Sequence, residues 1–259
     1  YVETRMHNVT LQYHSGVGFD VGGDYTHYTS DNNQTLLADY ADGGQSSFSI
    51  IGGQKIDRYS IYVDRKRSLA KEWDLGYGMS YRFAKDRDFQ TYDKVTGDIP
   101  TENTDSRLRE QTANVYVSLS KNYATGTSVS ISATGEYYAI GSYRKWAVYP
   151  QASLTYVKSP KHLFQLSLST DKTYPGYWDM QSSVSHLNGY TELWGTPGLK
   201  PSTAYNLNGN YIWKQKYIFG LFFMHTSDFF VQTGYQSTDR LALIYKNTNW
   251  NYMQMWGAN

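Results

Sequence analysis

A hydropathy period of two recurs along nearly the whole length of this chain. In residues 73–83, Asp, Gly, Ser and Arg alternate with the apolar side chains of Trp73, Leu75, Tyr77, Met79, Tyr81 and Phe83. Successive side chains of a β-strand point to opposite faces of the sheet, whereas a helix repeats every 3.6 residues. The sequence therefore predicts an all-β protein, built as an antiparallel up-and-down meander.

Eleven segments carry this pattern. We predict strands near residues 4–14, 18–30, 46–67, 72–92, 107–122, 127–144, 147–158, 162–174, 201–214, 217–234 and 240–252. Most are longer than the ~5–6 residues typical of strands in soluble sheets. They also reach the ~9–11 residues that a tilted strand needs to cross a bilayer. Their length therefore favours membrane-crossing strands, part of a large transmembrane β-barrel.

The predicted connections alternate between short and long. The short ones lie at residues 15–17, 68–71, 123–126, 159–161 and 215–216, and the long ones at 31–45, 93–106 and 174–200. In an up-and-down sheet every second connection lies at the same end. Tight turns at one end and long loops at the other are typical of outer-membrane barrels. Two more connections, at 142–145 and 236–239, are shorter than this alternation requires.

The alternation also predicts which side chains share a face. One face should carry Val115, Val117, Leu119, Val129, Ile131, Ala133, Leu154, Phe164, Leu166 and Leu168. The other should carry Ser118, Ser130, Ser132, Ser153 and Ser167. In a complete barrel the first set meets lipid and the second lines the lumen.

Composition leaves one alternative open. Mean hydropathy is −0.61 although 17% of the residues are aromatic, and no apolar run is long enough for a transmembrane helix. A net charge of +1 gives no electrostatic reason to expect nucleic acid as a partner. A soluble β-sandwich or adhesin-like binding domain with an aromatic ligand face is the alternative, but its strands should be shorter.

The last third of the chain resembles a known family. The loop Gly195-Thr196-Pro197-Gly198-Leu199-Lys200-Pro201-Ser202 precedes an alternating strand, and Tyr174-Pro175 and Tyr177-Trp178 lie upstream of it. This arrangement resembles the barrel of TonB-dependent outer-membrane receptors, in which the loop closes in Gly-Asn-Pro-x-Leu-x-Pro-Glu. Thr196 and Ser202 depart from that pattern. The segment "NTNWNYMQMWGAN" also resembles a strand of this family.

The resemblance implies an outer-membrane location and import of a nutrient ligand, such as a siderophore, glycan, vitamin or peptide. It further implies contact with outer-membrane lipid, and with a periplasmic energy-coupling protein through a plug domain. Neither the plug nor its coupling box is visible in this chain. We therefore expect residues 1–259 to be a single segment of a barrel of about 22 strands, excised from a longer receptor.

The loop from Gly195 to Ser202 has two interpretations. Pro197 and Pro201 fix φ and discourage helix before them, while Gly195 and Gly198 permit tight turns. The loop should therefore be stiff and should set the register of the strand that follows, because a one-residue slip exchanges the two faces. The other interpretation is that the loop itself binds ligand.

Five aromatic residues are the candidate ligand-binding residues. They are Tyr174, Tyr177, Trp178, Tyr190 and Trp194, the densest aromatic group in the long loop. Aromatic rings stack on sugars and amphipathic ligands, so a receptor loop could use them. They also fit an aromatic girdle at the membrane interface, or packing within the loop.

The sequence gives no support for catalysis, a cofactor or a bound metal. It contains no nucleophile elbow, HExxH motif or Walker loop, and it has no cysteine. An outer-membrane barrel enzyme would need converging acid and base groups, and no such set is visible. The acidic stretches that contain Asp86 and Asp88, and Asp39 and Asp42, offer oxygen ligands but lack EF-hand spacing. We expect these carboxylates to be solvated loop charges.

A sheet of about eleven strands cannot close with the shear and tilt of a barrel twice that size. We therefore expect free edges near residues 4–14 and 240–252, which invite pairing with another chain. Either the fragment self-associates through these edges or its apolar face, or it collapses into a smaller closed barrel.

Overall fold

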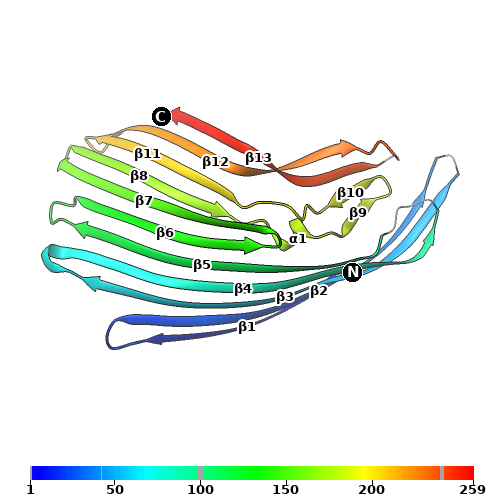
Figure 1. The fold of residues 1–259 in the computed structure, drawn as a ribbon. Helices are drawn as coiled ribbons and strands as arrows, with labels where there is room; N and C mark the ends of the chain where they lie inside the picture. Colours follow the sequence, from blue (N-terminus) through cyan, green and yellow to red (C-terminus); the bar gives the residue numbers. More distant parts are fainter. Residues whose placement is uncertain (1, 42, 98–101, 240–241) are drawn as a thin grey trace.

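The computed structural model describes residues 2–41, 43–97, 102–239 and 242–259. Its strands form one 13-stranded sheet in the order β1-β2-β3-β4-β5-β6-β7-β8-β11-β12-β13-β10-β9 (Figure 1). Neighbouring strands are antiparallel except β10 and β13, which are parallel. The described residues form a single sheet, whereas a β-sandwich consists of two stacked sheets. The fold therefore argues against the alternative of a soluble β-sandwich.

The strands have the following bounds: β1 Val2–His14, β2 Phe19–Asp39, β3 Gln45–Ser68, β4 Trp73–Thr96, β5 Thr104–Asn122, β6 Ser128–Ile140, β7 Tyr143–Ser159, β8 His162–Thr173, β9 Val184–Asn188, β10 Thr191–Trp194, β11 Ser202–Trp213, β12 Tyr217–Gln236 and β13 Leu243–Ala258. A 3₁₀ turn spans Ala70–Glu72, and one α-helical turn, α1, spans Tyr177–Met180. None of the described helices is long and apolar enough to cross a membrane.

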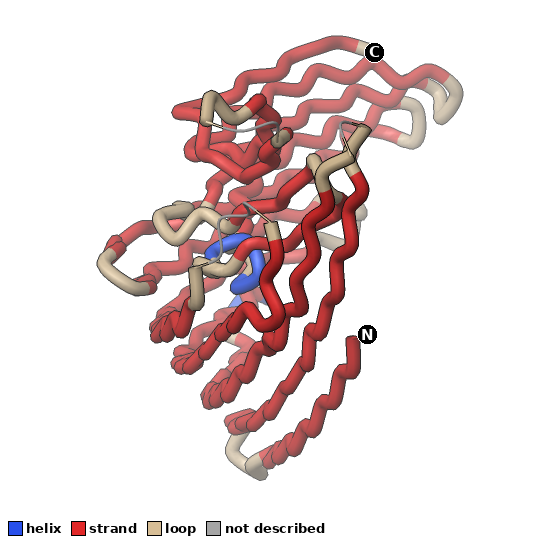
Figure 2. Tube along the Cα trace, turned by 90° about the vertical axis from the view of Figure 1, so that its right-hand side faces the viewer, coloured by secondary structure: helices blue, strands red, loops and turns tan. Residues whose placement is uncertain are grey.

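All eleven predicted strands are present, and the short turns lie together at one end of the sheet (Figure 1). Two predicted long loops are partly wrong. β2 continues to Asp39 and β4 to Thr96, so much of residues 31–45 and 93–106 is paired strand. The polar composition of these stretches predicts loop, but β3 pairs with β2 as far as Asp39 and, across a register shift, with Asp93 and Thr96 of β4. Figure 2 views the sheet from this long-hairpin end.

The third predicted loop contains structure that the sequence did not indicate. Residues 174–201, named here the inner loop, contain α1 and the short hairpin of β9 and β10. β10 adds to β13 in parallel, from Thr191 beside Leu243 to Trp194 beside Lys246. A four-residue strand has too few positions to show a hydropathy period, so alternation could not predict it.

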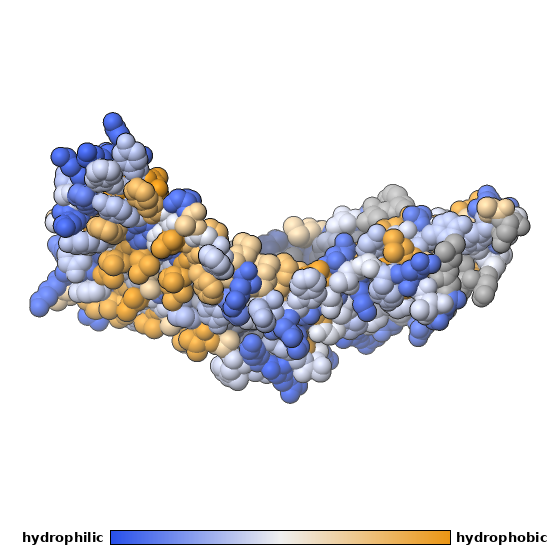
Figure 3. All heavy atoms as spheres, turned by 90° about the horizontal axis from the view of Figure 1, so that it is seen from above, coloured by the Kyte–Doolittle hydropathy of each residue, from blue (hydrophilic) through white to orange (hydrophobic). Residues whose placement is uncertain are grey.

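The register confirms the two predicted faces. Val117 lies beside Ala133, Ile131 beside Ala152, and Leu154 beside Leu166, so the apolar set shares one face, named here the outer face. Ser118 lies beside Ser132, and Ser130 and Ser167 both lie beside Ser153, on the opposite or inner face. The outer side chains are exposed, for example Val115 at 62% and Leu166 at 51%. Hydrophobic atoms gather toward the short-turn end (Figure 3).

On the outer face, the apolar band ends at a defined position along β4. On β4 it runs over residues 73–83, a length that fits a tilted membrane crossing of ~9–11 residues. Beyond Phe83 the same face carries Lys85 beside Arg109, and Arg87 beside Arg107. Charged side chains are unfavourable in hydrocarbon, so β4 from Lys85 onward lies outside the membrane-spanning segment.

The predicted free edges are only partly correct. β1 pairs with β2 alone among the described residues, so its other edge is free. At the far side, β10 covers Leu243–Lys246, because the inner loop folds back along β13. Residues 240–241 of that predicted edge lie outside the described residues. Among the strands described, no pairing joins β1 to the other end of the sheet, so collapse into a smaller closed barrel is not observed.

Candidate ligand-contacting site

The inner loop is held against the inner face by buried polar contacts. The Tyr174 hydroxyl donates a hydrogen bond to Glu136 of β6, and the Tyr177 hydroxyl donates to Glu110 of β5. Glu136 is 4% exposed and Glu110 is 7% exposed. Burial, followed by the charge of Glu110, raises the pKa of Tyr177, so its hydroxyl keeps the proton that it donates. The loop is therefore fixed at its N-terminal end by two phenol–carboxylate contacts.

A buried ion pair lies in the same cluster. Lys172, at the end of β8, is paired with Glu136, and the side chains are 12% and 5% exposed. The Lys172 ammonium also lies 4.5 Å from the centre of the Tyr138 ring and 4.7 Å from that of Tyr174. Such cation–π contacts help to compensate a desolvated ammonium. Next to this cluster, the loop residues Met180 and Leu199 pack with Tyr138 and Ile140 into a hydrophobic core.

The β9–β10 hairpin attaches the loop to the opposite part of the sheet. Gln90 of β4 donates to the carbonyl of Val184 at 2.7 Å, and its Oε1 accepts from the Val184 amide at 2.9 Å. Tyr92 Oη lies 2.8 Å from His186 Nε2, and Phe48 of β3 packs on the His186 ring at 4.7 Å. Because β10 pairs with β13, this hairpin links strands from both halves of the chain.

The segment from Gly195 to Pro201 is anchored rather than free. The Thr196 amide donates to the carbonyl of Asp179 at 2.6 Å, and its hydroxyl donates to the carbonyl of Asn247 in β13 at 2.6 Å. The Lys200 amide donates to Asn249 Oδ1 at 2.8 Å. These hydrogen bonds connect the loop to α1 and to β13 immediately before β11 begins.

Gly195 is required by close approach of the backbone. A Cβ at this position would lie 2.0 Å from the carbonyl oxygen of Gln181, whereas a Cβ on Gly198 would meet nothing within 4 Å. We expect Gly195→Ala to destabilise the attachment of the inner loop by about 1–3 kcal/mol. Gly198→Ala is the matched control and should have little effect. Limited proteolysis within residues 174–201 checks this, and equal cleavage of the two variants would contradict it.

The five predicted aromatic residues are in two groups. Tyr174 and Tyr177 are half-buried and hold the loop, as described above. Trp178, Tyr190 and Trp194 are 40%, 43% and 37% exposed. Tyr190 packs edge-on against Tyr40 with ring centres 5.6 Å apart, and the Trp194 indole donates to Glu192 at 2.7 Å. The exposed rings can contact an apolar or sugar-like surface. Sequence reasoning missed the residues that hold the loop in place, which are Glu110, Glu136 and Lys172 at its N-terminal end and Gln90, Val184 and His186 at the β9–β10 hairpin.

Comparison with known proteins identifies the family. The profile of the outer membrane protein beta-barrel family matches residues 14–259. The chain belongs to this family. The outer membrane β-barrel protein described here accordingly resides in the cell outer membrane, and its exposed outer face meets lipid. No curated protein matches the sequence.

Solved structures with the same fold are receptors. The siderophore receptor PirA from Pseudomonas aeruginosa has a TM-score of 0.54 at 11% identity, over 99% of this chain and 52% of that one. The ferric enterobactin receptor PfeA from P. aeruginosa, in complex with enterobactin, has 0.54 at 10% identity, over 99% and 49%. P. aeruginosa FpvA bound to a heterologous pyoverdine has 0.53 at 14% identity, over 98% and 37%. The chain therefore spans about half or less of these receptors, and the likeness shows the fold.

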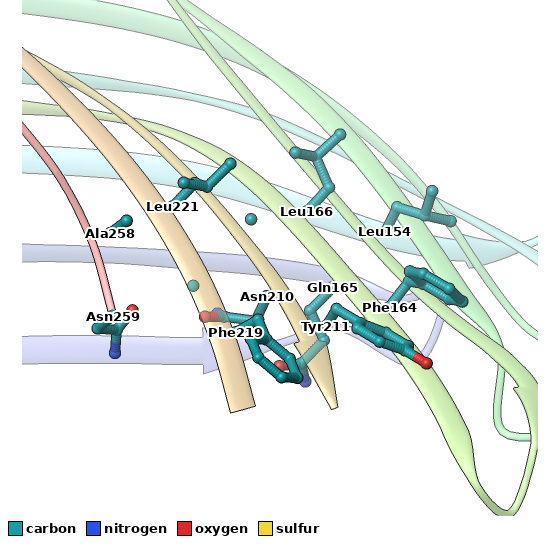
Figure 4. Close-up of a pocket in the computed structure, with 12 residues that line it drawn as sticks. Leu154, Phe164, Gln165, Leu166, Asn210, Tyr211, Phe219, Leu221, Ala258 and Asn259 are labelled. Carbon is teal, nitrogen blue, oxygen red and sulfur yellow. The ribbon is translucent and has the colours of Figure 1, made fainter. Parts of the chain in front are cut away.

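A hollow of about 580 Å³ lies on the outer face of the barrel protein (Figure 4). Leu154, Phe164 and Leu166 line it from β7 and β8, and Gly209 leaves space between Leu166 and Leu221. Because this face meets the bilayer, the apolar lining fits lipid acyl chains. The candidate ligand-contacting site is instead the inner loop, on the opposite face.

Groups of three or more His, Cys, Asp or Glu side chains placed to hold a metal are absent from the residues that the structure describes. The polar pairs found at the inner loop are phenol–carboxylate and ammonium–carboxylate contacts, which hold segments together. The arrangement can position aromatic rings and exclude water beneath the loop.

Proposed function

We propose that this chain forms part of the wall of an energy-coupled outer-membrane receptor that imports a nutrient ligand. One observation carries the proposal: the inner loop is held over the polar inner face by Tyr174 and Tyr177, and it carries three exposed aromatic rings, those of Trp178, Tyr190 and Trp194. The inner face below it is rich in Ser, Thr, Asn and Gln, which suits passage of a hydrated ligand along the wall. No catalytic step is part of this function.

The ligand belongs to the class of siderophores, glycans, vitamins or peptides. The solved relatives include a siderophore receptor and a ferric enterobactin receptor, which supports iron chelates as the first candidates to test. Import against a gradient needs energy, so the proposal includes a periplasmic energy-coupling protein that acts through a plug domain. Trp178, Tyr190 and Trp194 are the residues proposed to contact the ligand, while Tyr174 and Tyr177 position the loop.

Substitution of the exposed aromatics tests the proposal. Cells expressing the receptor are exposed to ferric enterobactin, cobalamin, a maltooligosaccharide and a tryptic peptide mixture, and saturable binding is measured for each. For the probe that binds, we expect Tyr190→Ala and Trp194→Ala each to weaken affinity about tenfold or more, because a buried aromatic contributes about 1.5–3 kcal/mol.

The matched control is Trp146→Ala. Trp146 is 76% exposed on the outer face, beside Tyr137, and should not contact a ligand in the lumen. Its loss should leave affinity unchanged at equal receptor levels. Equal affinity of all three variants would remove the aromatic site from the proposal, and no saturable binding of any probe would contradict import of these ligand classes.

A further inference from the structure

The side chains of Asp86 and Asp88 are buried, contrary to the expectation that they are solvated loop charges. They are 4% and 3% exposed on the inner side of β4, where β3 and β5 pair on either side of them. The inner loop covers them, since Ser183 hydrogen-bonds to Asp88. The charge of Asp86 also acts on the Tyr177 hydroxyl of α1. Both aspartates lie beyond Phe83, outside the membrane-spanning part of the strand.

No cation is paired with either carboxyl group. Among the described residues, no Lys, Arg or His nitrogen lies within 4.0 Å of Asp86 or Asp88. Asp86 Oδ1 and Asp88 Oδ2 are buried without a hydrogen-bond partner in that part of the chain. Two negative charges on the same face of one strand would also repel each other. Because a buried, uncompensated charge is strongly unfavourable, one member of the pair should carry a proton.

The basic groups on the surrounding elements are engaged elsewhere. Arg82, on β4 itself, lies 3.8 Å from Glu110 of β5. Arg58 of β3 donates a hydrogen bond to a threonine of β2 at 3.4 Å. On the inner loop, the His186 ring lies 3.6 Å from Glu192. The strands and the loop packed around the two aspartates therefore supply acidic groups at least as readily as basic ones, and they leave the pair without compensation.

The environment distinguishes the two aspartates. Burial, followed by the charge of Asp88, raises the pKa of Asp86 to about 7. Burial, and to a smaller extent the charge of Asp105 on β5, raises the pKa of Asp88, whereas hydrogen bonds donated by Ser183 lower it. Tyr177 of α1 stays neutral because burial raises its pKa. Asp86 is therefore the member that holds the proton, and Asp88 is the member whose charge accepts hydrogen bonds from the loop.

We propose that pH controls the attachment of the segment Gln181–Ser185 to β4: with a proton on Asp86 the segment stays bound to Asp88, and loss of that proton releases it. The pKa of Asp86 is raised while the loop covers it, and it returns toward 3.8 when the loop opens and water enters. The closed loop thus binds the proton more tightly than the open loop does. Its stability accordingly falls as the pH rises from about 4 to about 7, and it changes little above that.

The release is confined to one part of the inner loop. Tyr174 holds the N-terminal end through Glu136, and the pairing of β10 with β13 holds the other end. Opening therefore separates Gln181–Ser185 from β4, together with the two hydrogen bonds between Gln90 and this segment. Trp178 lines the same small cavity as Asp88, so the opening changes the surroundings of one proposed ligand contact. This inference does not depend on which nutrient the receptor imports.

Hydrogen exchange of the purified receptor in detergent tests the proposal. Protection of residues 181–185 is measured by mass spectrometry at about pH 5 and about pH 8, and is corrected for the intrinsic exchange rates. We expect protection in the wild type to fall at least about tenfold between the two pH values. Asp86→Asn has nearly the same shape but no charge, so its protection should stay high at both. The control is Asp105→Asn, which should keep the wild-type dependence because Asp105 is 44% exposed and paired with Arg87.

A second readout needs only the wild type, so it does not require the Asp86 variant to fold. Infrared difference spectra should show a protonated carboxyl group that loses its proton with a midpoint of about pH 7. Protection of residues 181–185 should fall up to that pH and level off above it, while residues 205–211 of β11 should keep constant protection. Equal wild-type protection at both pH values, an unchanged pH dependence in Asp86→Asn, or no carboxyl group titrating near neutral pH would each overturn the proposal.

Discussion

Replacing Lys172 with methionine is expected to destabilise the protein by about 3–5 kcal/mol, because it leaves a buried carboxylate without its cation. Glu136 is 4% exposed, and its remaining partners are the hydroxyls of Tyr149 and Tyr174. Hydroxyl donors stabilise the anion less than an ammonium does. Urea unfolding of the protein in lipid vesicles measures the change. Cleavage within residues 174–201 should also become faster, since Tyr174 holds the loop through the same carboxylate.

The double variant Lys172→Met with Glu136→Leu distinguishes the effect of breaking the ion pair from the effect of burying apolar side chains at its two positions. Replacing both members of a buried ion pair with apolar groups is often close to neutral. We therefore expect it to regain most of the stability that Lys172→Met loses. The control is Arg87→Met at the exposed pair of Arg87 and Asp105, which should cost less than about 1 kcal/mol. Similar losses for Lys172→Met and Arg87→Met would show that the inner pair is not buried in solution.

An arginine on the outer face should be the other strongly destabilising change. Ile131 is 53% exposed and lies in the apolar band of β6, between Leu119 and Ala152. Arginine at the middle of the bilayer costs about 2–4 kcal/mol in outer-membrane barrels. Ile131→Arg should lower the free energy of unfolding in vesicles by that amount.

Ser132→Arg is the adjacent control. Ser132 lies on the inner face, between Ser118 and Gln151, where an added guanidinium can stay hydrated. Its cost should be well below that of Ile131→Arg. If the two substitutions had equal effects, the assignment of outer and inner faces would be incorrect. In detergent-free buffer, the wild type should also associate through its outer face, and light scattering would detect this.

The hydropathy alternation predicted the eleven long strands and the two faces of the sheet. Alternation at residues such as Val117, Ser118 and Leu119 is a local property, and a strand converts it directly into two faces. Each long strand contains enough positions for the period to be recognised, and each short turn limits its strands to antiparallel pairing. The family resemblance likewise depended on consecutive residues, from Gly195 to Ser202.

The arrangement of the inner loop and its surroundings depends on contacts between segments that are distant in the sequence. β9 and β10 are short, and their partners lie far away in the sequence, with Gln90 bonded to Val184 across 94 positions. Glu110, Glu136 and Lys172 become one cluster because β5, β6 and β8 curve around the same loop. Asp86 and Asp88 change from predicted solvated charges to buried ones because a distant segment covers them. Burial depends on what packs against a residue, and that information is not contained in its neighbours along the chain.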